Sequence, residues 1–373
     1  MARGNNLKKS EKGERKLRVL HVAPAPFGRD GFFGGGERYS FELAKEMAKT
    51  ADVRLLSFAK EGRTTKHSSG FIEKILGNPV FVRGQRTNPL HHGLFKEIFW
   101  SDIVHCHQTH VLVSEISALV ARLLGKRVFT TDHGGGNWCL NGYLATRKLF
   151  TKHLHVSTFG QGLMGMSSWK KSEVIYGGVD TDRFNPGNEE LSKPKIVFVG
   201  RIMPHKGIDQ IIQCLPEGLK FEVIGRPYHR EYFEKLQGLA FGKEVVFRED
   251  ASDADIVEAY QTSRCVVLPS VYKDYFGNES IVPELLGLTL LEGMACGKPG
   301  LVTNVTSLPE IVSHRLNGWI VEPGDLEMFR KILIEIRDNP WLCRDMGEKA
   351  RKTVASKFTW QKTVERCLAA YCG

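Results

Sequence analysis

The sequence predicts an α/β protein whose parallel sheets are covered by helices on both faces. Three observations lead to this class. Short apolar runs of strand length recur along the chain, stretches with helical periodicity separate them, and glycine-rich turns follow several of the runs. With 373 residues, 42% of them hydrophobic and 25% charged, the chain is long enough for two domains that each bury a core. We therefore expect two doubly wound domains.

The elements follow from the pattern in chain order. A strand is expected at residues 17–23, then a long glycine-containing loop, then a helix on which Tyr39, Leu43 and Met47 recur every four residues. Later apolar runs predict further strands at residues 53–58, 102–106, 127–131, 196–199, 221–224 and 265–268. Helices are expected at residues 111–124, 288–295 and 326–337.

A polar stretch at residues 185–194 is the best candidate for a linker between the two domains. Residues 1–16 form a basic leader that we expect to be disordered. Its cations are concentrated in residues 8–16, as Lys8, Lys9, Lys12, Arg15 and Lys16. They fit a solubilising tail or a tether to an anionic membrane.

Glu284 and Glu292, eight positions apart, give the strongest indication of a ligand site. Gly287 lies between them, and the expected helix begins at Leu288. The opening amides and positive dipole end of such a helix suit an anion such as phosphate. Isolated glutamates are usually solvated, but beside a phosphate seat this pair is predicted to touch different parts of one extended ligand.

A second group of charges follows the expected strand at residues 196–199, where Gly200 interrupts the apolar run and Arg201, Lys206 and Gly207 come next. The planar fork of an arginine and the compact ammonium of a lysine together can hold a diphosphate without a metal ion. Cations in loops are usually solvated. The prediction is that these two neutralise the charge of a leaving group.

Glycines and histidines in the first half occupy comparable positions. Gly34, Gly35 and Gly36 have no side chains to keep a diphosphate or sugar away from the amides near the helix start. His107 and His133 each follow an expected strand, at the edge where open α/β sheets place ligand groups. Packed or solvated histidines are the common alternative at such positions.

Taken together, these motifs resemble family 4 of the retaining GT-B glycosyltransferases. The resemblance rests on Phe198-Val-Gly-Arg201, Lys206-Gly207, the E-x7-E pair, Gly297-Lys-Pro299, Leu308-Pro-Glu310 and Asn317-Gly318, in that order. It implies a GT-B fold, in which two Rossmann-like domains face each other across a cleft. The acceptor side would be residues 17–186, the nucleotide-sugar side residues 195–355, and the final helix, residues 356–373, would cross back to the first domain.

The resemblance also implies roles for the singled-out residues. The donor diphosphate would be bound by cations and helix-start residues of both domains, namely Arg201, Lys206, Gly35, Gly36, Gly287 and Leu288. Glu284 would lie by the transferred sugar as an orienting and electrostatic group, and Glu292 would bind the ribose hydroxyls. His107 would reach the donor sugar, and we expect His133 on the acceptor side.

The implied activity is transfer of a sugar from a nucleotide diphosphate sugar to a hydroxyl acceptor, a glycan or a lipid-linked one, with retention at the anomeric carbon. In this family the departing phosphate takes the acceptor proton. No metal and no cofactor is expected, since the nucleotide sugar is a substrate. Three residues depart from the usual pattern: Leu286 replaces phenylalanine, Gly293 replaces alanine, and Gly177 replaces asparagine.

Composition bears on the cellular compartment and on the kinds of partner that the protein can bind. The eight cysteines lie outside C-x-x-C pairs, which predicts a reducing compartment with neither a zinc site nor a disulfide framework. The sequence predicts no signal peptide and no membrane span, so we expect a cytoplasmic protein, with the inner face of the membrane as an alternative. The net charge of +10 suits phosphate-bearing partners, and no specific nucleic-acid motif accompanies it.

Two stretches, GLFKEIFW and TRKLFTKHLH, mix aromatic residues with cations. A membrane-surface patch or an acceptor groove can have this composition, and so can an ordinary helix with one core face and one wet face, which we favour.

Three rival functions remain. A nicotinamide oxidoreductase is disfavoured because the first loop is longer than the tight G-x-G-x-x-G turn and residues 57–60, at the end of the second strand, offer no acid. A GT-B epimerase or phosphorylase shares the expected architecture. A non-catalytic protein that binds sugar nucleotides or polyanions would bind without turnover.

Overall fold

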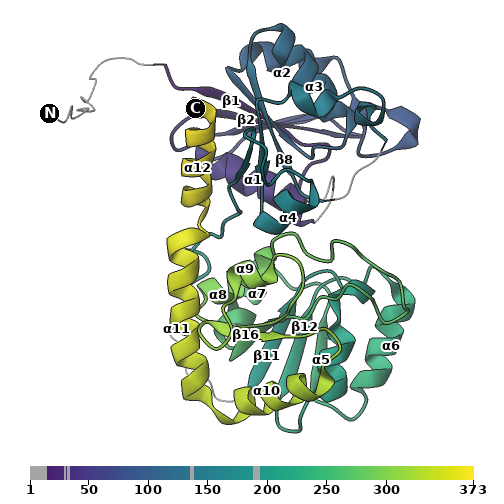
Figure 1. Ribbon diagram of the computed structural model, residues 1–373, viewed down its shortest axis with the longest axis vertical. Coiled ribbons are helices and arrows are strands. Elements are labelled where there is room, and N and C mark those ends of the chain that lie inside the picture. Colours follow the sequence, from purple (N-terminus) through teal and green to yellow (C-terminus); the bar gives the residue numbers. More distant parts are fainter. Residues whose placement is uncertain (1–14, 29–30, 32–33, 135–137, 188–193) are drawn as a thin grey trace, which may run out of the picture.

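The computed structural model describes residues 15–28, 31, 34–134, 138–187 and 194–373. It contains two α/β domains stacked along the long axis of the molecule, each built on its own sheet (Figure 1). The predicted class is therefore confirmed. Residues 1–14 of the predicted leader lie outside the described residues, and Arg15 forms an ion pair with Asp102 at 2.6 Å.

The first sheet has eight strands, all parallel to their neighbours except the edge strand β3. From edge to edge they are β10 (Ser172–Val174), β9 (Lys152–His155), β8 (Arg127–Asp132), β7 (Ile103–His107), β1 (Arg18–Val22), β2 (Asp52–Ala59), β4 (Ile72–Gly77) and β3 (Arg63–Lys66). A separate small hairpin pairs β5 (Val80–Phe81) with β6 (Pro89–Leu90).

The second sheet has six strands, all parallel. They are β13 (Val245–Arg248), β12 (Lys220–Ile224), β11 (Lys195–Val199), β14 (Cys265–Leu268), β15 (Gly300–Thr303) and β16 (Gly318–Val321). Apolar strands buried on both faces are typical of parallel sheets, which is why these runs were readable from sequence.

The helices of the first domain are α1 (Gly35–Met47), α2 (Gly93–Trp100), α3 (Leu112–Leu123) and α4 (Thr158–Leu163). Those of the second are α5 (Ile208–Cys214), α6 (Arg230–Ala240), α7 (Asp253–Gln261), α8 (Leu288–Ala295), α9 (Leu308–Ile311) and α10 (Leu326–Asp338). Short 3-10 turns are η1 (Val82–Gly84), η2 (Leu140–Gly142), η3 (Thr146–Leu149) and η4 (Pro204–Lys206).

The chain ends in two consecutive helices that span both domains. The long helix α11 (Pro340–Lys357) packs against α8 of the second domain, and α12 (Trp360–Cys372) packs against α1 of the first (Figure 1). The break between them is at Phe358 and Thr359, and the Thr359 hydroxyl accepts a hydrogen bond from the Lys362 amide at 3.2 Å to begin α12.

Strand order places ligand-binding positions at two points. In each sheet the early strands are added on one side of the first strand, β1 or β11, and the later strands on its other side. The change of side falls between β1 and β7 in the first sheet and between β11 and β14 in the second. Parallel α/β sheets bind ligands beyond the strand ends at such a change of side. His107 is the last residue of β7, and Gly200 and Arg201 directly follow β11, so the singled-out residues occupy these positions.

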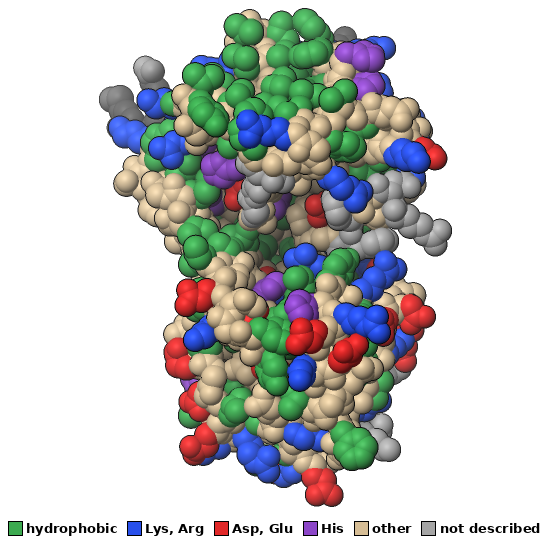
Figure 2. Space-filling model, turned by 90° about the vertical axis from the view of Figure 1, so that its right-hand side faces the viewer, with side chains coloured by type: hydrophobic (Ala, Val, Ile, Leu, Met, Phe, Trp, Pro, Cys, Tyr) green, Lys and Arg blue, Asp and Glu red, His purple; other side chains and the backbone are tan. Residues whose placement is uncertain are grey.

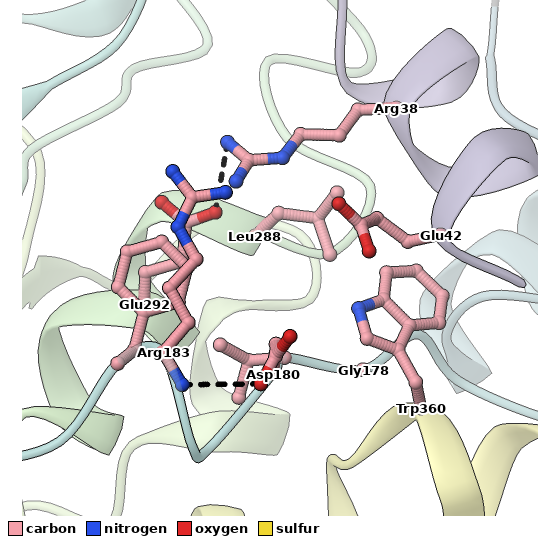
Figure 3. A pocket seen from close by; sticks show the side chains of 10 residues that line it. Arg38, Glu42, Gly178, Asp180, Arg183, Leu288, Glu292 and Trp360 are labelled. Atoms are coloured by element: carbon pink, nitrogen blue, oxygen red, sulfur yellow. Dashed lines mark hydrogen bonds and ion pairs between the residues drawn. The ribbon is translucent and has the colours of Figure 1, made fainter. Parts of the chain in front are cut away.

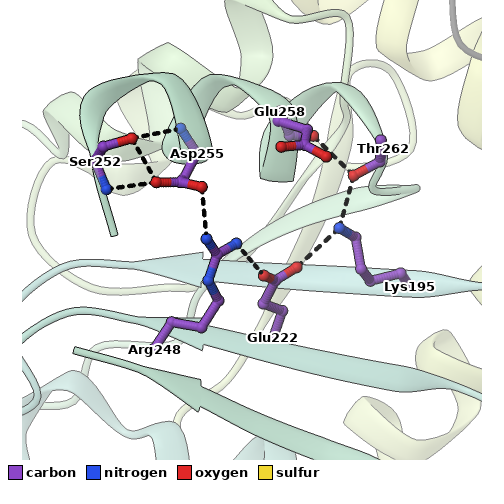
Figure 4. A network of polar contacts seen from close by, with 7 residues as sticks. All are labelled: Lys195, Glu222, Arg248, Ser252, Asp255, Glu258 and Thr262. Carbon is purple, nitrogen blue, oxygen red and sulfur yellow. Dashed lines mark hydrogen bonds and ion pairs between the residues drawn. The ribbon is translucent and has the colours of Figure 1, made fainter. Parts of the chain in front are cut away.

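A polar network ties together three strands and a helix of the second domain (Figure 4). The buried Glu222 carboxylate contacts Lys195 at 2.8 Å and Arg248 at 3.0 Å, and Arg248 continues to Asp255 at 2.8 Å. Burial opposes ionisation of Glu222, but the two cations outweigh it and lower its pKa. Ser252 and Asp255 form a capping box at the start of α7. The network thus fixes β11, β12, β13 and α7 as one unit.

Candidate active site

The two predicted charge groups of the second domain meet. The Lys206 ammonium, buried, forms an ion pair with the Glu284 carboxylate and lies 3.4 Å from the Pro283 carbonyl. These residues are 78 positions apart in sequence. The sequence placed Lys206 on the donor diphosphate and Glu284 by the transferred sugar, and the structure brings the two into direct contact.

A glycine with a left-handed backbone positions Lys206. Gly207 has φ +63°, and a Cβ there would come within 2.1 Å of the Pro269 carbonyl oxygen. Only glycine combines that conformation with that close approach. The turn η4 is thereby held against Pro269, which directly follows β14, and the Lys206 side chain reaches Pro283 and Glu284.

Arg201 is exposed and lies across the cleft from Glu37, on the first turn of α1. Burial raises the pKa of Glu37, and the positive charge of Arg201 partly opposes that rise. The Arg201 guanidinium also lies 5.9 Å from the centre of the Tyr228 ring. A carboxylate of the protein therefore faces the guanidinium at the position where sequence analysis placed an anion.

The helix α8 begins and ends at the predicted residues, with Gly287 as its N-cap in the left-handed region at φ +85°. A Cβ on Gly287 would lie 3.1 Å from Leu268, the last residue of β14. The amide of Leu288 is in the first helical turn, where no helical acceptor precedes it. This helix start can therefore donate hydrogen bonds to an anion, as predicted.

Glu292 is buried between the domains, in a cavity lined by residues of both (Figure 3). Its Oε1 atom lies 3.0 Å from Nη1 of Arg38, a residue of α1, and the Tyr260 hydroxyl donates to its Oε2 at 3.4 Å. Burial raises the pKa of the Glu292 carboxyl, while Arg38 and Arg183 oppose that rise. Glu292 in turn raises the pKa of Arg38. The predicted ribose-binding carboxylate is thus paired across the domain boundary.

Gly35 and Gly36 lie within the first turn of α1 and not in the loop before it. A Cβ on Gly36 would lie 3.0 Å from the His133 Cβ. The absence of a side chain at this position lets the helix start approach His133 closely. The glycine segment and His133, predicted on separate grounds, form one side of the site.

His107 is buried, and both of its ring nitrogens face other imidazoles. Its Nε2 lies 2.9 Å from Nδ1 of His21, and its Nδ1 lies 3.2 Å from Nε2 of His133. His21 Nε2 lies 3.4 Å from the Met47 sulfur. The residue predicted to reach the donor sugar is therefore the middle of a chain whose half-buried end is His133.

One set of tautomers follows if the contact between His21 Nε2 and the Met47 sulfur is a hydrogen bond. A thioether sulfur only accepts, so His21 carries its proton on Nε2 and accepts at Nδ1. His107 must then donate from Nε2 and accept at Nδ1, and His133 must donate from Nε2. The Nδ1 atom of His133 is left with its lone pair. Burial lowers the pKa of His21 and of His133 to about 3 and that of His107 far below its usual value, so all three are neutral at pH 7.

Ring nitrogens of His21, His105 and His107 lie within 4.8 Å of one another, a spacing that could hold a metal ion. His105 Nδ1 lies 2.6 Å from the Tyr371 hydroxyl and its Nε2 lies 2.7 Å from the Thr131 hydroxyl. The hydrogen bonds therefore account for both nitrogens of His105 and of His107 without an ion.

The segment after Glu284 inserts into the first domain. A Cβ on Gly134, next to His133, would lie 2.6 Å from a methyl carbon of Leu285. The Leu285 side chain therefore lies against the backbone beside His133 and brings the neighbouring Glu284 to that part of the cleft. The predicted catalytic carboxylate and the predicted acceptor-side histidine thus belong to one site.

Sequence analysis missed the partners that the first domain and α9 supply to this site. Arg38 and Glu37 directly follow the glycine segment, and their position on the first turn of α1 was the available signal. Glu310, part of the Leu308-Pro-Glu310 motif, accepts hydrogen bonds from the amides of Thr158 at 2.8 Å and Phe159 at 2.7 Å, and so holds the start of α4.

Comparison with known protein families agrees with this geometry. Residues 180–353 match the model of Glycosyl transferases group 1, and residues 33–183 match that of Glycosyltransferase Family 4. The chain is a GT-B glycosyltransferase of this family. Together the two matches cover residues 33–353 of this GT-B glycosyltransferase.

Individual relatives are distant. An uncharacterized glycosyltransferase of Methanocaldococcus jannaschii is 25% identical over 72% of this chain and 75% of its own length. The D-inositol 3-phosphate glycosyltransferase of Mycolicibacterium smegmatis is 27% identical over 53% of this chain and 46% of its own length.

Among solved structures, sucrose-phosphate synthase from Thermosynechococcus elongatus superimposes with a TM-score of 0.73 at 18% identity, covering 96% of this chain and 98% of its own. Anabaena HepE in complex with UDP and glucose gives 0.71 at 15% identity, covering 95% of this chain and 99% of its own. At these identities the structural likeness establishes the GT-B fold.

Proposed function

We propose that this glycosyltransferase moves a sugar from a nucleotide diphosphate sugar to a hydroxyl of a glycan or lipid-linked acceptor, with retention at the anomeric carbon. One observation carries the proposal. Both carboxylates of the E-x7-E pair lie at the domain boundary in contact with cations, Glu284 with Lys206 and Glu292 with Arg38. A nucleotide sugar offers phosphate oxygens to Lys206 and hydroxyl donors to the carboxylates of Glu284 and Glu292.

Binding would proceed by exchange of partners. A diphosphate carries more negative charge than one carboxylate, so Lys206 and Arg201 would turn to phosphate oxygens, with the amides of α8 supporting them. Glu284 would then be free to accept hydrogen bonds from the sugar. The ribose hydroxyls would replace the Arg38 guanidinium on Glu292. Solved relatives that bind UDP and UDP-glucose support a uridine diphosphate sugar as the first donor to test.

The chemical step breaks the bond between C1 and the diphosphate oxygen and forms a bond between C1 and the acceptor oxygen. Negative charge grows on the diphosphate, where Arg201 and Lys206 stabilise it, while the sugar acquires oxocarbenium character, which Glu284 favours. The departing phosphate accepts the acceptor proton on the same face. His133 Nδ1, an acceptor in that set of histidine tautomers, would orient a sugar hydroxyl. No metal enters the proposed step.

The proposal is tested with Glu284→Gln. A panel of UDP-, GDP- and ADP-sugars first identifies the donor by thermal shift, and transfer to candidate acceptors is then measured by product formation. The variant should lose at least about a hundredfold in kcat, in keeping with loss of a transition-state contact, while its affinity for the nucleoside diphosphate stays within a few-fold of the wild type.

Glu348→Gln, an exposed carboxylate on α11, is the matched control and should transfer at the wild-type rate. Unchanged turnover of Glu284→Gln would remove the assigned role. Products formed without an acceptor would indicate an epimerase, products formed only with free phosphate a phosphorylase, and binding without turnover a non-catalytic protein.

A further inference from the structure

The outer face of α2 and α3 carries large exposed apolar side chains. Phe95 and Phe99, one turn apart on α2, are 42% and 61% exposed. Leu119, Leu123 and Leu124, on α3 and at its end, are 46%, 78% and 37% exposed. The two helices pack against each other, and we call these five residues the α2–α3 surface. Figure 2 shows apolar side chains gathered at the upper end of the molecule, where Figure 1 draws α2 and α3.

The helix α2 completes its core contacts without these aromatic rings. Leu94 and Ile98 are buried, and the buried Glu97 carboxylate lies 2.6 Å from Arg54 and 2.5 Å from Lys74. We favoured a core-facing helix with a wet side for this stretch, and the structure places its two phenylalanines on the wet side. Single exposed apolar residues are common, but a contiguous group on neighbouring helices marks an interaction site.

The exposed charged side chains of the stretch that contains α2 and α3 have one sign. Along residues 92–127 the exposed charged side chains are the cations Lys96, Arg122 and Arg127. The carboxylates of Glu97 and Glu115 are buried, and that of Asp102 is paired with Arg15 and Arg18. The stretch GLFKEIFW therefore presents aromatic rings and positive charge to the same side.

The surface is also fixed in shape. The Lys126 ammonium donates to the carbonyls of Ile98 and Phe99, each at 2.8 Å, and to that of Ser101, so it closes the C-terminal end of α2 from the loop that follows α3. The contact between Arg15 and Asp102, directly after α2, also places the end of the basic leader beside this surface. In the sequence Lys8, Lys9 and Lys12 precede Arg15.

We propose that the α2–α3 surface docks the protein on an anionic lipid bilayer. Phe95, Phe99 and Leu123 enter the boundary between headgroups and acyl chains, and the surrounding cations contact lipid phosphates. Apolar burial and attraction to anionic headgroups act together in interfacial binding of this kind. A second copy is a poorer occupant, because a two-fold contact through this face would bring its cations together. The inference is independent of the proposed transfer reaction.

The test is sedimentation of the full chain with phosphatidylcholine vesicles that contain phosphatidylglycerol, compared with phosphatidylcholine alone. Wild-type protein should sediment with the anionic vesicles and bind the neutral ones less. The double variant Phe99→Ser, Leu123→Ser should bind the anionic vesicles at least about tenfold more weakly, since each side chain contributes apolar area. Its thermal midpoint should stay near the wild-type value, because neither residue belongs to the core.

A matched control is Phe241→Ser, Trp341→Ser, which removes side chains 92% and 75% exposed on the second domain and should leave vesicle binding unchanged. No sedimentation with anionic vesicles would overturn the proposal, as would an equal loss in both double variants. A dimer seen by light scattering that Phe99→Ser, Leu123→Ser dissociates would also overturn it, because the surface would then serve a second copy.

Discussion

At the residue scale, the three departures from the family pattern find their explanation in packing. A Cβ on Gly177 would lie 2.6 Å from a methyl carbon of Leu286 and 3.0 Å from the Tyr39 ring, so two of the departures touch each other across the domain boundary. A Cβ on Gly293 would lie 2.7 Å from the Val266 Cβ. Glycine at both positions is therefore matched to the packing of its neighbours.

The contact between Gly177 and Leu286 predicts coupled effects. Gly177→Asn should destabilise the protein by about 1–3 kcal/mol through overpacking and lower the midpoint of thermal unfolding. Leu286→Ala removes the side chain that the new asparagine would meet. The double variant should therefore lose less free energy of unfolding than the sum of the losses of the two single variants. Gly142→Asn, in open space, is the control. Additive midpoint shifts would show that the two sites do not interact.

At the element scale, the strands β1, β7 and β8 position the histidines. His21 and His105 are directly opposite each other in the register of β1 and β7, and His107 is two residues further along. Residues two apart on a strand share a face, so these rings gather on the side of the sheet that α1 and α12 cover with Met47 and Tyr371. His133, the histidine at the site, is thereby supported by the buried rings of His21, His105 and His107.

Burial of these histidines makes the free energy of unfolding depend on pH. The pKa of His21 and of His133 is lowered to about 3 in the fold, against 6.5 without it, so below pH 6.5 the unfolded chain binds protons that the folded chain does not. Stability is complete above pH 6.5 and falls toward pH 3, by up to about 1.4 kcal/mol per pH unit for each such histidine. The thermal midpoint should fall steadily from pH 7 to pH 5. Imidazole NMR signals of these residues that titrate near pH 6.5 in the native protein would contradict this account.

Elements with strong local patterns could be predicted from the sequence. The strand β14 and the helix α8 have the predicted bounds, and β1, β7, β11 and α3 are within one residue at either end. The antiparallel edge strand β3 was not predicted, because Arg-Thr-Thr-Lys carries no apolar alternation.

The site was predictable in part for the same reason. The ends of buried strands and the loops that follow them carry their own signal, which identified His107 at the end of β7 and Arg201 and Lys206 after β11. The contacts of Arg38 with Glu292 and of Leu285 with Gly134 join residues far apart in the chain, and nothing in the local sequence at either end specifies the other.

At the scale of the whole molecule, the two domains are held together by contacts of different chemistry. Arg38 and Glu292 form a buried ion pair, the Glu310 carboxylate holds the start of α4, and α12 returns to pack on α1. Two of these contacts use residues of the sequence motifs, Glu292 of the E-x7-E pair and Glu310 of Leu308-Pro-Glu310. We therefore expect occupation of the cleft by a donor to be linked to the relative position of the domains.

Removing Arg38 should expose this linkage. Arg38→Ala leaves the Glu292 carboxylate buried and unpaired, a change that typically costs about 3–5 kcal/mol, so the thermal midpoint should fall. A nucleoside diphosphate should then raise the midpoint of Arg38→Ala more than that of the wild type, because its ribose no longer has to displace a guanidinium.

Lys349→Ala, which removes an exposed pair with Asp345, should change neither the midpoint nor the response to ligand. A ligand-induced shift in Arg38→Ala equal to or smaller than that of the wild type would show that ribose and Arg38 do not compete for Glu292.

The central claim is that Arg201 and Lys206 hold the diphosphate of the donor. Isothermal titration calorimetry tests it most directly, with a nucleoside diphosphate and the corresponding nucleoside titrated into the wild type, Arg201→Ala and the exposed control Arg330→Ala. We predict that Arg201→Ala weakens binding of the nucleoside diphosphate by about tenfold or more and leaves binding of the nucleoside unchanged. The control Arg330→Ala should affect the binding of neither ligand. Equal losses for both ligands, or no loss for the diphosphate, would contradict the account.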